Sequence, residues 1–359
     1  MTVVRGDGSI GRSMSATQAD AAAETALVVA AQNGDEAAFA QLAERHRGEL
    51  EVHCYRMLGS LEDAEDLVQE VLLRAWRKRA TFEGRSTFRA WLYRIATNAC
   101  LDQLDQRPRQ VLAPQIAPAA DPRLEPGPAA DLPRLQPYPD HLLDAVAASE
   151  PGPAEATVAK ETIELAFLAA IQYLPPRQRA VLILRDALGW SAGETASLVD
   201  TSVAAVNSAL QRARGTLKTH LPGGRLDWAP TADPDEDERS LLRRYVDAWE
   251  RADVNALVAL LREDVRLTMP PLPTWFDGRD AVGEFLARRP LAEGASEHRR
   301  VPTRANRQPA FGVYLRRQGD SAFRPFAIEV LRIQDGLVAE IHYFIFPQLF
   351  SSFGLPPQP

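Results

Sequence analysis

Four polar side chains recur at intervals that place them on one face of a predicted helix. The helix covers residues 63–78, where intervals of three and four residues bring side chains to the same face. This face carries Asp63, Asp66, Gln69 and Glu70. Leu67, Val71 and Leu72 belong to the opposite face and can pack into a core. Taken alone, the pattern fits a docking surface for another macromolecule or an ordinary solvated helix face.

The next segment, residues 82–98, mixes arginines with aromatic side chains. It carries Trp91 and Tyr93 among Arg85, Arg89 and Arg94. Guanidinium groups bind phosphates and aromatic rings stack on unpaired bases, so the blend suits nucleic acid. Because this helix must also bury one face, we expect Trp91, Tyr93 and Ile95 to lie in its core rather than against bases.

A second polar helix face is predicted further along the chain. The string Leu174-Pro-Pro-Arg-Gln-Arg179 places proline near a helix N-terminus. Ser191 and Glu194 then have the spacing of a capping box before a short helix that ends near Leu198. A longer helix follows, with inner positions Val203, Val206, Leu210 and Ala213. Its cap and outer face are Ser202, Ala204, Asn207, Ser208, Gln211, Arg212 and Arg214. These residue types reach base edges and phosphates in helix-turn-helix proteins, although a plain helical hairpin leaves a similar pattern.

Composition limits the possible classes of protein. The chain has 359 residues, enough for two or three domains, and a net charge of −7, which is unusual for a protein that binds DNA alone. No apolar run approaches the length of a membrane span and no export signal precedes the first helix, so we expect a cytoplasmic protein. Cys54 and Cys100 are expected to be core residues. Neither a metal-ligand cluster nor a glycine-rich phosphate loop is present, so we predict no metal and no cofactor.

Changes in composition along the chain divide it into folded segments and linkers. Residues 1–24 are predicted to be disordered, 25–106 helical, 107–154 a Pro/Ala-rich linker, 155–221 helical, 222–236 a second linker, and 237–350 a third domain. The longer linker would have a relaxed span of about 35–40 Å, which would leave the distance between the helical domains free.

The third domain changes from helix to strand patterns along its length. We predict helices over 241–261 and 278–288, and strands over 265–269, 310–315, 326–333 and 337–346. Gln334-Asp-Gly336 is a hairpin turn between the last two strands. Helices followed by antiparallel strands indicate an α+β domain.

The acidic helix, the arginine-aromatic segment and the helix-turn-helix occur in the order found in bacterial sigma factors. They resemble the second and fourth regions of the extracytoplasmic-function (ECF) class. The resemblance implies two all-α domains, a region 2 helical bundle and a region 4 helix-turn-helix, with core RNA polymerase and promoter DNA as partners. It assigns polymerase binding to Asp63, Asp66, Gln69, Glu70 and Arg74. It assigns the downstream promoter element to Arg85, Ser86, Arg89, Arg94 and Asn98, and the upstream element to the outer face near residues 202–214.

The third domain resembles the SnoaL-like, cone-shaped α+β fold, which encloses a pocket. Candidate pocket residues are Tyr245, Trp249, Met269, Trp275, Phe285, Tyr314, Glu329 and His342. The resemblance therefore implies a sigma factor that is not itself an enzyme, with the C-terminal domain modulating its activity, with or without a small-molecule ligand. Two alternatives stay open: a cyclase- or isomerase-like enzyme fused to a DNA-binding module, and a DNA-binding regulator that acts without polymerase. The negative charge counts against the last, and a separate anti-sigma protein is left undecided.

Overall fold

The computed structural model describes residues 23–106, 118–129, 135–149, 163–220 and 235–359. These ranges form a first helical domain (23–106), a second helical domain (163–220), a C-terminal domain (235–359) and two pieces of the long linker. The predictions for residues 1–22 lie outside the described residues, whereas Ala23 and Glu24 already belong to a helix. In the described parts of the chain, every helix is too short or too polar to cross a membrane.

Three long helices that follow the one at residues 23–32 form the centre of the first helical domain, and their ends follow from local sequence. Asp35 caps the first of them by accepting hydrogen bonds from two backbone N–H groups. Gly59 ends it with φ of 71°, and Ser60 caps the next helix through the N–H of Asp63. These two residues therefore separate the first of these helices from the second. The helices are α2 (Glu36–Leu58), α3 (Leu61–Lys78) and α4 (Phe88–Gln106).

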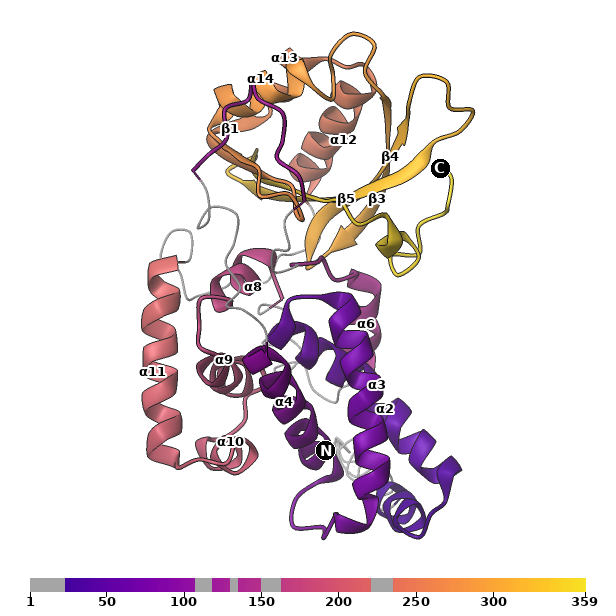
Figure 1. The fold of residues 1–359 in the computed structure, drawn as a ribbon, viewed down its shortest axis with the longest axis vertical. Helices are drawn as coiled ribbons and strands as arrows, with labels where there is room; N and C mark the ends of the chain where they lie inside the picture. The colour runs from indigo at the N-terminus through magenta and orange to yellow at the C-terminus, as the bar shows by residue number, and fades with distance from the viewer. Residues whose placement is uncertain (1–22, 107–117, 130–134, 150–162, 221–234) are drawn as a thin grey trace, which may run out of the picture.

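The second helical domain contains the predicted helix-turn-helix. The capping box is present, with Ser191 N donating to Glu194 Oε2 at 2.8 Å and Glu194 N donating to Ser191 Oγ at 3.2 Å. Ser202 accepts from the N–H of Ala205 and begins the last helix. The elements are α8 (Leu165–Ile171), α9 (Pro176–Leu182), the π-helical turn η2 (Ile183–Ala187), α10 (Ala192–Leu198) and α11 (Val203–His220). Figure 1 shows α11 standing at the outer edge of the two helical domains.

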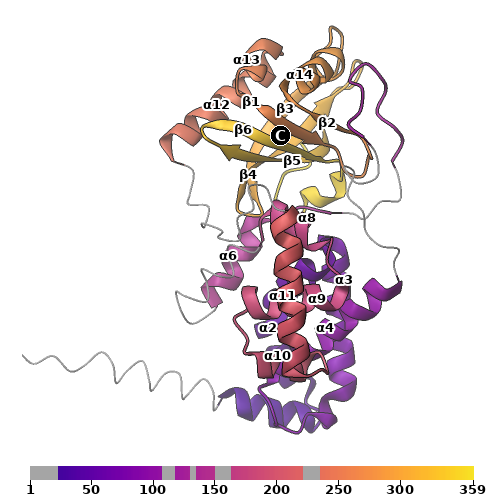
Figure 2. The same ribbon diagram turned by 90° about the vertical axis from the view of Figure 1, so that its left-hand side faces the viewer.

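The C-terminal domain is a six-stranded sheet with helices on one face. The strand order is β2-β1-β6-β5-β4-β3, with β1 and β6 parallel and the other pairs antiparallel. The strands are β1 (Leu261–Thr268), β2 (Trp275–Asp277), β3 (Glu297–Ala305), β4 (Gln308–Arg316), β5 (Arg324–Gln334) and β6 (Leu337–Phe344). The helices are α12 (Glu236–Glu250), α13 (Val254–Val258) and α14 (Arg279–Arg288), and a short turn η4 (Pro347–Phe350) follows the sheet. Figure 2 shows this domain above both helical domains.

One prediction for this domain is wrong in its boundaries, and two strands were missed. The helix expected over 241–261 is divided into α12, α13 and the start of β1, because Ala252 has φ of 52° and Asp253 caps α13. Strands β2 and β3 were not predicted. The hairpin turn between β5 and β6 is confirmed, with positive φ at Asp335 and Gly336.

The long linker is more ordered than its composition indicates. Residues 140–149 form α6 (Asp140–Ser149), and residues 118–129 lie along the C-terminal domain. Ala120 N donates to Trp275 O at 2.8 Å, which joins this linker piece to β2. The described parts of the linker are therefore attached to folded domains rather than free.

Candidate polymerase and promoter interfaces

The polar face of α3 is open to solvent along its length. Asp66, Gln69 and Glu70 are exposed, and Asp63 and Arg74 are half-buried. Arg74 Nη2 lies 2.6 Å from Glu70 Oε1, which holds these two side chains together. The opposite face is buried at Leu67, Val71 and Leu72, as predicted.

Leu73 adds an apolar group to this surface that sequence reasoning missed. Its side chain is 56% exposed. Its exposure could have been predicted from its position three residues after Glu70 and seven after Asp66, which places it on the polar side of the helix.

A cleft of about 1080 Å³ separates the loop before α4 from helix α10. Its lining residues with basic side chains are Arg74, Lys78, Arg85 and Arg94, and those with aromatic side chains are Phe82, Trp91 and Trp190. Ser86 and Asn98 line it as well, and Glu194 contributes from α10. The arginine-aromatic segment thus faces a concave surface, as contact with an unpaired strand requires.

Arg89 differs from the other predicted DNA contacts of this segment. Its Nε lies 2.6 Å from Glu49 Oε2, and its guanidinium lies 5.1 Å from the ring centroid of Tyr93. Burial raises the pKa of Glu49, but the hydrogen bond from His46 and the charge of Arg89 outweigh it and lower that pKa below its ordinary value. Arg89 therefore joins α4 to α2 and does not line the cleft.

The expectation that three apolar side chains of α4 lie in the core is correct in part. Tyr93 is buried, and its ring centroid lies 5.3 Å from that of Trp190 in the second helical domain. Trp91 and Ile95 are only half-buried and line the cleft. They pack on the core and also present one edge to the cleft.

The outer face of α11 is exposed at all seven predicted positions, from Ser202 to Arg214. Arg214 makes two hydrogen bonds to Asp186, at 2.7 and 2.9 Å, which raise its pKa. Val206, Leu210 and Ala213 are buried as predicted. Val203 is not, with 46% exposure, because side chains of a first turn point past the helix end.

The comparisons with known proteins agree with this arrangement. Residues 42–110 match Sigma-70 region 2, residues 164–217 match Sigma-70 region 4, and residues 242–341 match the SnoaL-like domain. The ECF RNA polymerase sigma factor SigG of Mycobacterium tuberculosis (strain ATCC 25618 / H37Rv) is 41% identical over 319 residues, covering 89% of this chain and 84% of the relative. The chain belongs to the ECF RNA polymerase sigma factors.

Two other relatives cover different shares of this sigma factor. SigW of Bacillus subtilis (strain 168) is 28% identical over 191 residues, which is 53% of this chain and 92% of that relative. The crystal structure of Mycobacterium tuberculosis SigJ covers 89% of this chain and 99% of its own, with a TM-score of 0.54 and 23% identity. This likeness shows that the whole three-domain fold has a counterpart.

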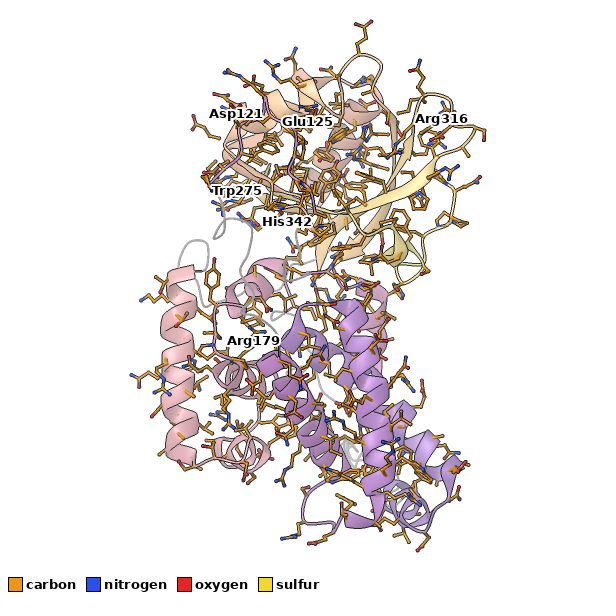
Figure 3. The ribbon with its side chains drawn as sticks, in the orientation of Figure 1. Asp121, Glu125, Arg179, Trp275, Arg316 and His342 are labelled. Atoms are coloured by element: carbon orange, nitrogen blue, oxygen red, sulfur yellow. The ribbon has the colours of Figure 1, made fainter. Side chains whose placement is uncertain are left out.

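A buried arginine joins the two helical domains of the sigma factor, hereafter region 2 and region 4. Arg179 Nη1 donates to Met57 O of region 2 at 2.6 Å. Its other nitrogens donate to three carbonyls of region 4, Ile171 O at 3.1 Å, Gln172 O at 3.2 Å and Leu174 O at 3.5 Å. Burial lowers the pKa of Arg179 to about 10. Figure 3 shows this residue inside the helical half of the sigma factor.

The C-terminal domain of the sigma factor contains a buried polar cluster under its helices. Tyr245 Oη donates to Glu329 Oε1 at 2.6 Å, and Arg300 Nε lies 2.7 Å from Glu329 Oε2. The Arg300 guanidinium also donates to Tyr343 and lies 3.7 Å from the ring centroid of Trp249. Burial raises the pKa of Tyr245 well above its ordinary value. Arg300 was missed because β3 was not predicted.

The structure brings together only some of the predicted pocket residues. Tyr245, Trp249, Met269 and Phe285 belong to the core under the helices, where Glu329 binds Tyr245. Tyr314 instead belongs to the hydrophobic core that includes the helical domains, where its ring centroid lies 5.0 Å from that of Phe350. His342 binds Thr268 and Glu340 at 2.8 and 3.0 Å, and Trp275 lies under Arg266.

Neither a metal site nor an oxidised cysteine pair is found in the parts of the chain that the structure describes. No group of three or more His, Cys, Asp or Glu side chains there could hold a metal ion. Cys54 and Cys100 are free and buried, as expected for core residues.

Proposed function

We propose that this sigma factor binds core RNA polymerase through the exposed polar face of α3. The observation that carries the proposal is that α3 has two unlike faces. One face is buried in region 2, whereas Asp66, Gln69 and Glu70 on the other face are exposed. Asp63 and Arg74 border this face and belong to the same surface. Because core RNA polymerase is a cytoplasmic enzyme, we propose the same location for this sigma factor.

The cleft of region 2 is the proposed site for the opened strand of the downstream promoter element. Arg85 and Arg94 supply positive charge, and Ser86 and Asn98 supply hydrogen-bonding groups. Extruding a base costs a few kcal/mol, and stacking on an aromatic ring returns about 1–3 kcal/mol per base. Trp91 and Phe82 are placed in the lining to provide such contacts. Arg89 acts indirectly, because it positions α4 through Glu49.

The exposed face of α11 is proposed to read the upstream element in the major groove. Asn207, Gln211 and Arg212 are of the types that bind base edges or phosphates, and among the described residues none of the three is paired with a carboxylate. Arg214 is held by Asp186, which suits a phosphate contact of fixed geometry.

The C-terminal domain is proposed to modulate these steps without catalysing a reaction. The buried carboxylate that could serve as a base, Glu329, is bound by both Arg300 and Tyr245. Each of its two carboxylate oxygens therefore already accepts a hydrogen bond from a buried side chain of the same domain. The alternative, a cyclase- or isomerase-like activity, would require that carboxylate to be released by a ligand. Turnover in a small-molecule screen that is lost in Glu329→Gln, while the circular dichroism of the variant stays that of the wild type, would favour that alternative.

The test is co-elution with core RNA polymerase on gel filtration. Asp66→Arg with Glu70→Arg reverses the charge of the α3 face and is expected to abolish co-elution. A matched control, Asp237→Arg with Asp280→Arg, makes the same charge change on exposed helices of the C-terminal domain and should co-elute normally. Equal co-elution of both variants would refute the assignment to α3.

A further inference from the structure

One turn of the C-terminal domain contacts three separate parts of the chain. The turn joins β3 to β4, and its residues Asn306 and Arg307 have φ of 55° and 61°. The backbone N–H of Asn306 and its whole side-chain amide are hydrogen-bonded. Its N–H donates to Tyr138 O at 2.9 Å, and its Oδ1 accepts from Tyr138 N at 2.8 Å. Its Nδ2 donates to Tyr55 Oη at 2.9 Å and to Ile163 O at 2.6 Å.

These partners come from different domains. Tyr55 belongs to α2 of region 2, Tyr138 to the linker, and Ile163 to the chain that leads into region 4. Asn306 is fully buried, so water cannot replace the bonds while the domains stay together. A single amide group thus connects the two DNA-reading regions through the C-terminal domain.

Further hydrogen bonds next to those of Asn306 hold the linker in place. Tyr55 Oη donates to Gln136 O at 2.7 Å, and Gln136 N donates to Gly59 O at 2.9 Å. On the other side, Arg307 N donates to Asp140 Oδ1 at 2.8 Å and Arg304 Nε lies 3.1 Å from Asp140 Oδ2. The linker is therefore bound to region 2 and to the C-terminal domain at once.

A second piece of the linker is bound at the far side of the same domain. Gly127 N donates to Thr274 Oγ1 at 3.1 Å, and Arg123 Nε lies 3.1 Å from Glu284 Oε1. Glu125 pairs with Arg289. Figure 3 labels Asp121 and Glu125 on the upper part of the molecule, against the C-terminal domain.

The side chain of Asn306 is not needed to form the turn itself. Glycine adopts positive φ with the least strain, and the β5–β6 turn of the same domain uses Asp335 and Gly336 at similar angles. Those two residues are exposed. The bonds of the Asn306 amide therefore serve the docking of domains rather than the hairpin.

We propose that the C-terminal domain restrains the sigma factor in a closed arrangement by holding its linker, and that the Asn306 turn is the latch. This rests on the proposed function, in which region 2 and region 4 bind separate promoter elements. While Tyr55 and Ile163 share one amide, region 2 cannot move away from the start of region 4. Release of the turn must come before the two regions separate on DNA.

The test measures the distance between regions in the full-length protein without polymerase. Dyes are attached at Gln41→Cys in region 2 and Lys218→Cys in region 4, both exposed, whereas Cys54 and Cys100 are buried. Asn306→Gly keeps the turn and removes the side-chain bonds, so the open, low-transfer population is expected to rise about tenfold or more. Asp335→Gly is the matched control at the exposed turn and should leave the distribution unchanged.

A second variant distinguishes loss of the Asn306 contact from misfolding of the turn. Tyr55→Phe removes the hydroxyl that links the Asn306 amide to region 2 and should also raise the open population. An unchanged distance in both variants, with normal circular dichroism, would overturn the latch. Because this readout needs no polymerase, such a result would leave the α3 docking proposal intact, and failure of the wild-type protein to bind polymerase would leave the latch result valid.

Discussion

Replacing Arg179 by methionine tests how strongly region 2 and region 4 are joined. The substitution keeps much of the apolar stem and removes a guanidinium that is 3% exposed. Three carbonyls within 3.2 Å then lose a charged donor, one from region 2 and two from region 4. Because no carboxylate is among its hydrogen-bond partners, these carbonyls supply the stabilisation of the charge.

The size of the effect follows from two opposing contributions. Hydrogen bonds to a charged group contribute about 1.5–3 kcal/mol each, which gives about 4.5–9 kcal/mol for the three. Burial opposes this, since a pKa lowered from 12.5 to about 10 corresponds to about 3 kcal/mol against the charged form. The net loss expected for Arg179→Met is therefore about 2–6 kcal/mol. Arg179→Lys should lose part of this, because one ammonium cannot reach carbonyls on both sides.

Urea unfolding followed by tryptophan fluorescence and circular dichroism measures the change. Arg177→Met is the control, because Arg177 is exposed on the same helix, and it should change the free energy of unfolding by less than about 0.5 kcal/mol. Equal stability of the two methionine variants would refute the reasoning. Two separate transitions in Arg179→Met, where the wild type has one, would show directly that the domains have uncoupled.

Two further predictions concern buried ionisable groups. Burial, with Arg56 and Arg89 nearby, lowers the pKa of His53 from 6.5 to about 3, so the unfolded state binds a proton that the folded state excludes and stability falls as pH drops below 6.5. The loss at pH 5 is about 2 kcal/mol, and His53→Gln should flatten this part of a stability–pH curve measured by urea unfolding; an unaltered slope would contradict it. Glu329→Gln leaves Arg300 buried without its carboxylate and should cost about 3–5 kcal/mol; in the same assay Glu297→Gln, at the exposed ion pair with Arg316, should cost less than about 0.5 kcal/mol, and equal losses would argue against a buried charge pair.

The helical domains were predictable because their signals are local. Gly59 and Ser60 end one helix and begin the next, and Ser191 and Glu194 satisfy each other's backbone groups. Such caps act within four residues, so they are legible without tertiary information.

The C-terminal domain was less predictable because its features depend on distant partners. β3 carries Arg300, whose partner Glu329 lies on another strand, and Pro302, which a strand accepts here because β3 is at the edge of the sheet. A charged strand with an internal proline lacks the alternation of apolar and polar residues by which strands are predicted. The docking of the linker likewise depends on Asn306, more than a hundred residues away from Tyr138, and nothing near Tyr138 indicates it.

The position of α10 affects one of the three proposed binding surfaces and leaves the other two exposed. The outer face of α11 and the polar face of α3 are both exposed in the closed arrangement, whereas the cleft of region 2 has Glu194, Ser197 and Leu198 of α10 as one wall. In the proposed function, duplex DNA and polymerase thus have exposed surfaces to meet in the closed arrangement. The cleft is instead bordered by both helical regions, so separating them would alter the proposed strand site and leave the other two faces unchanged.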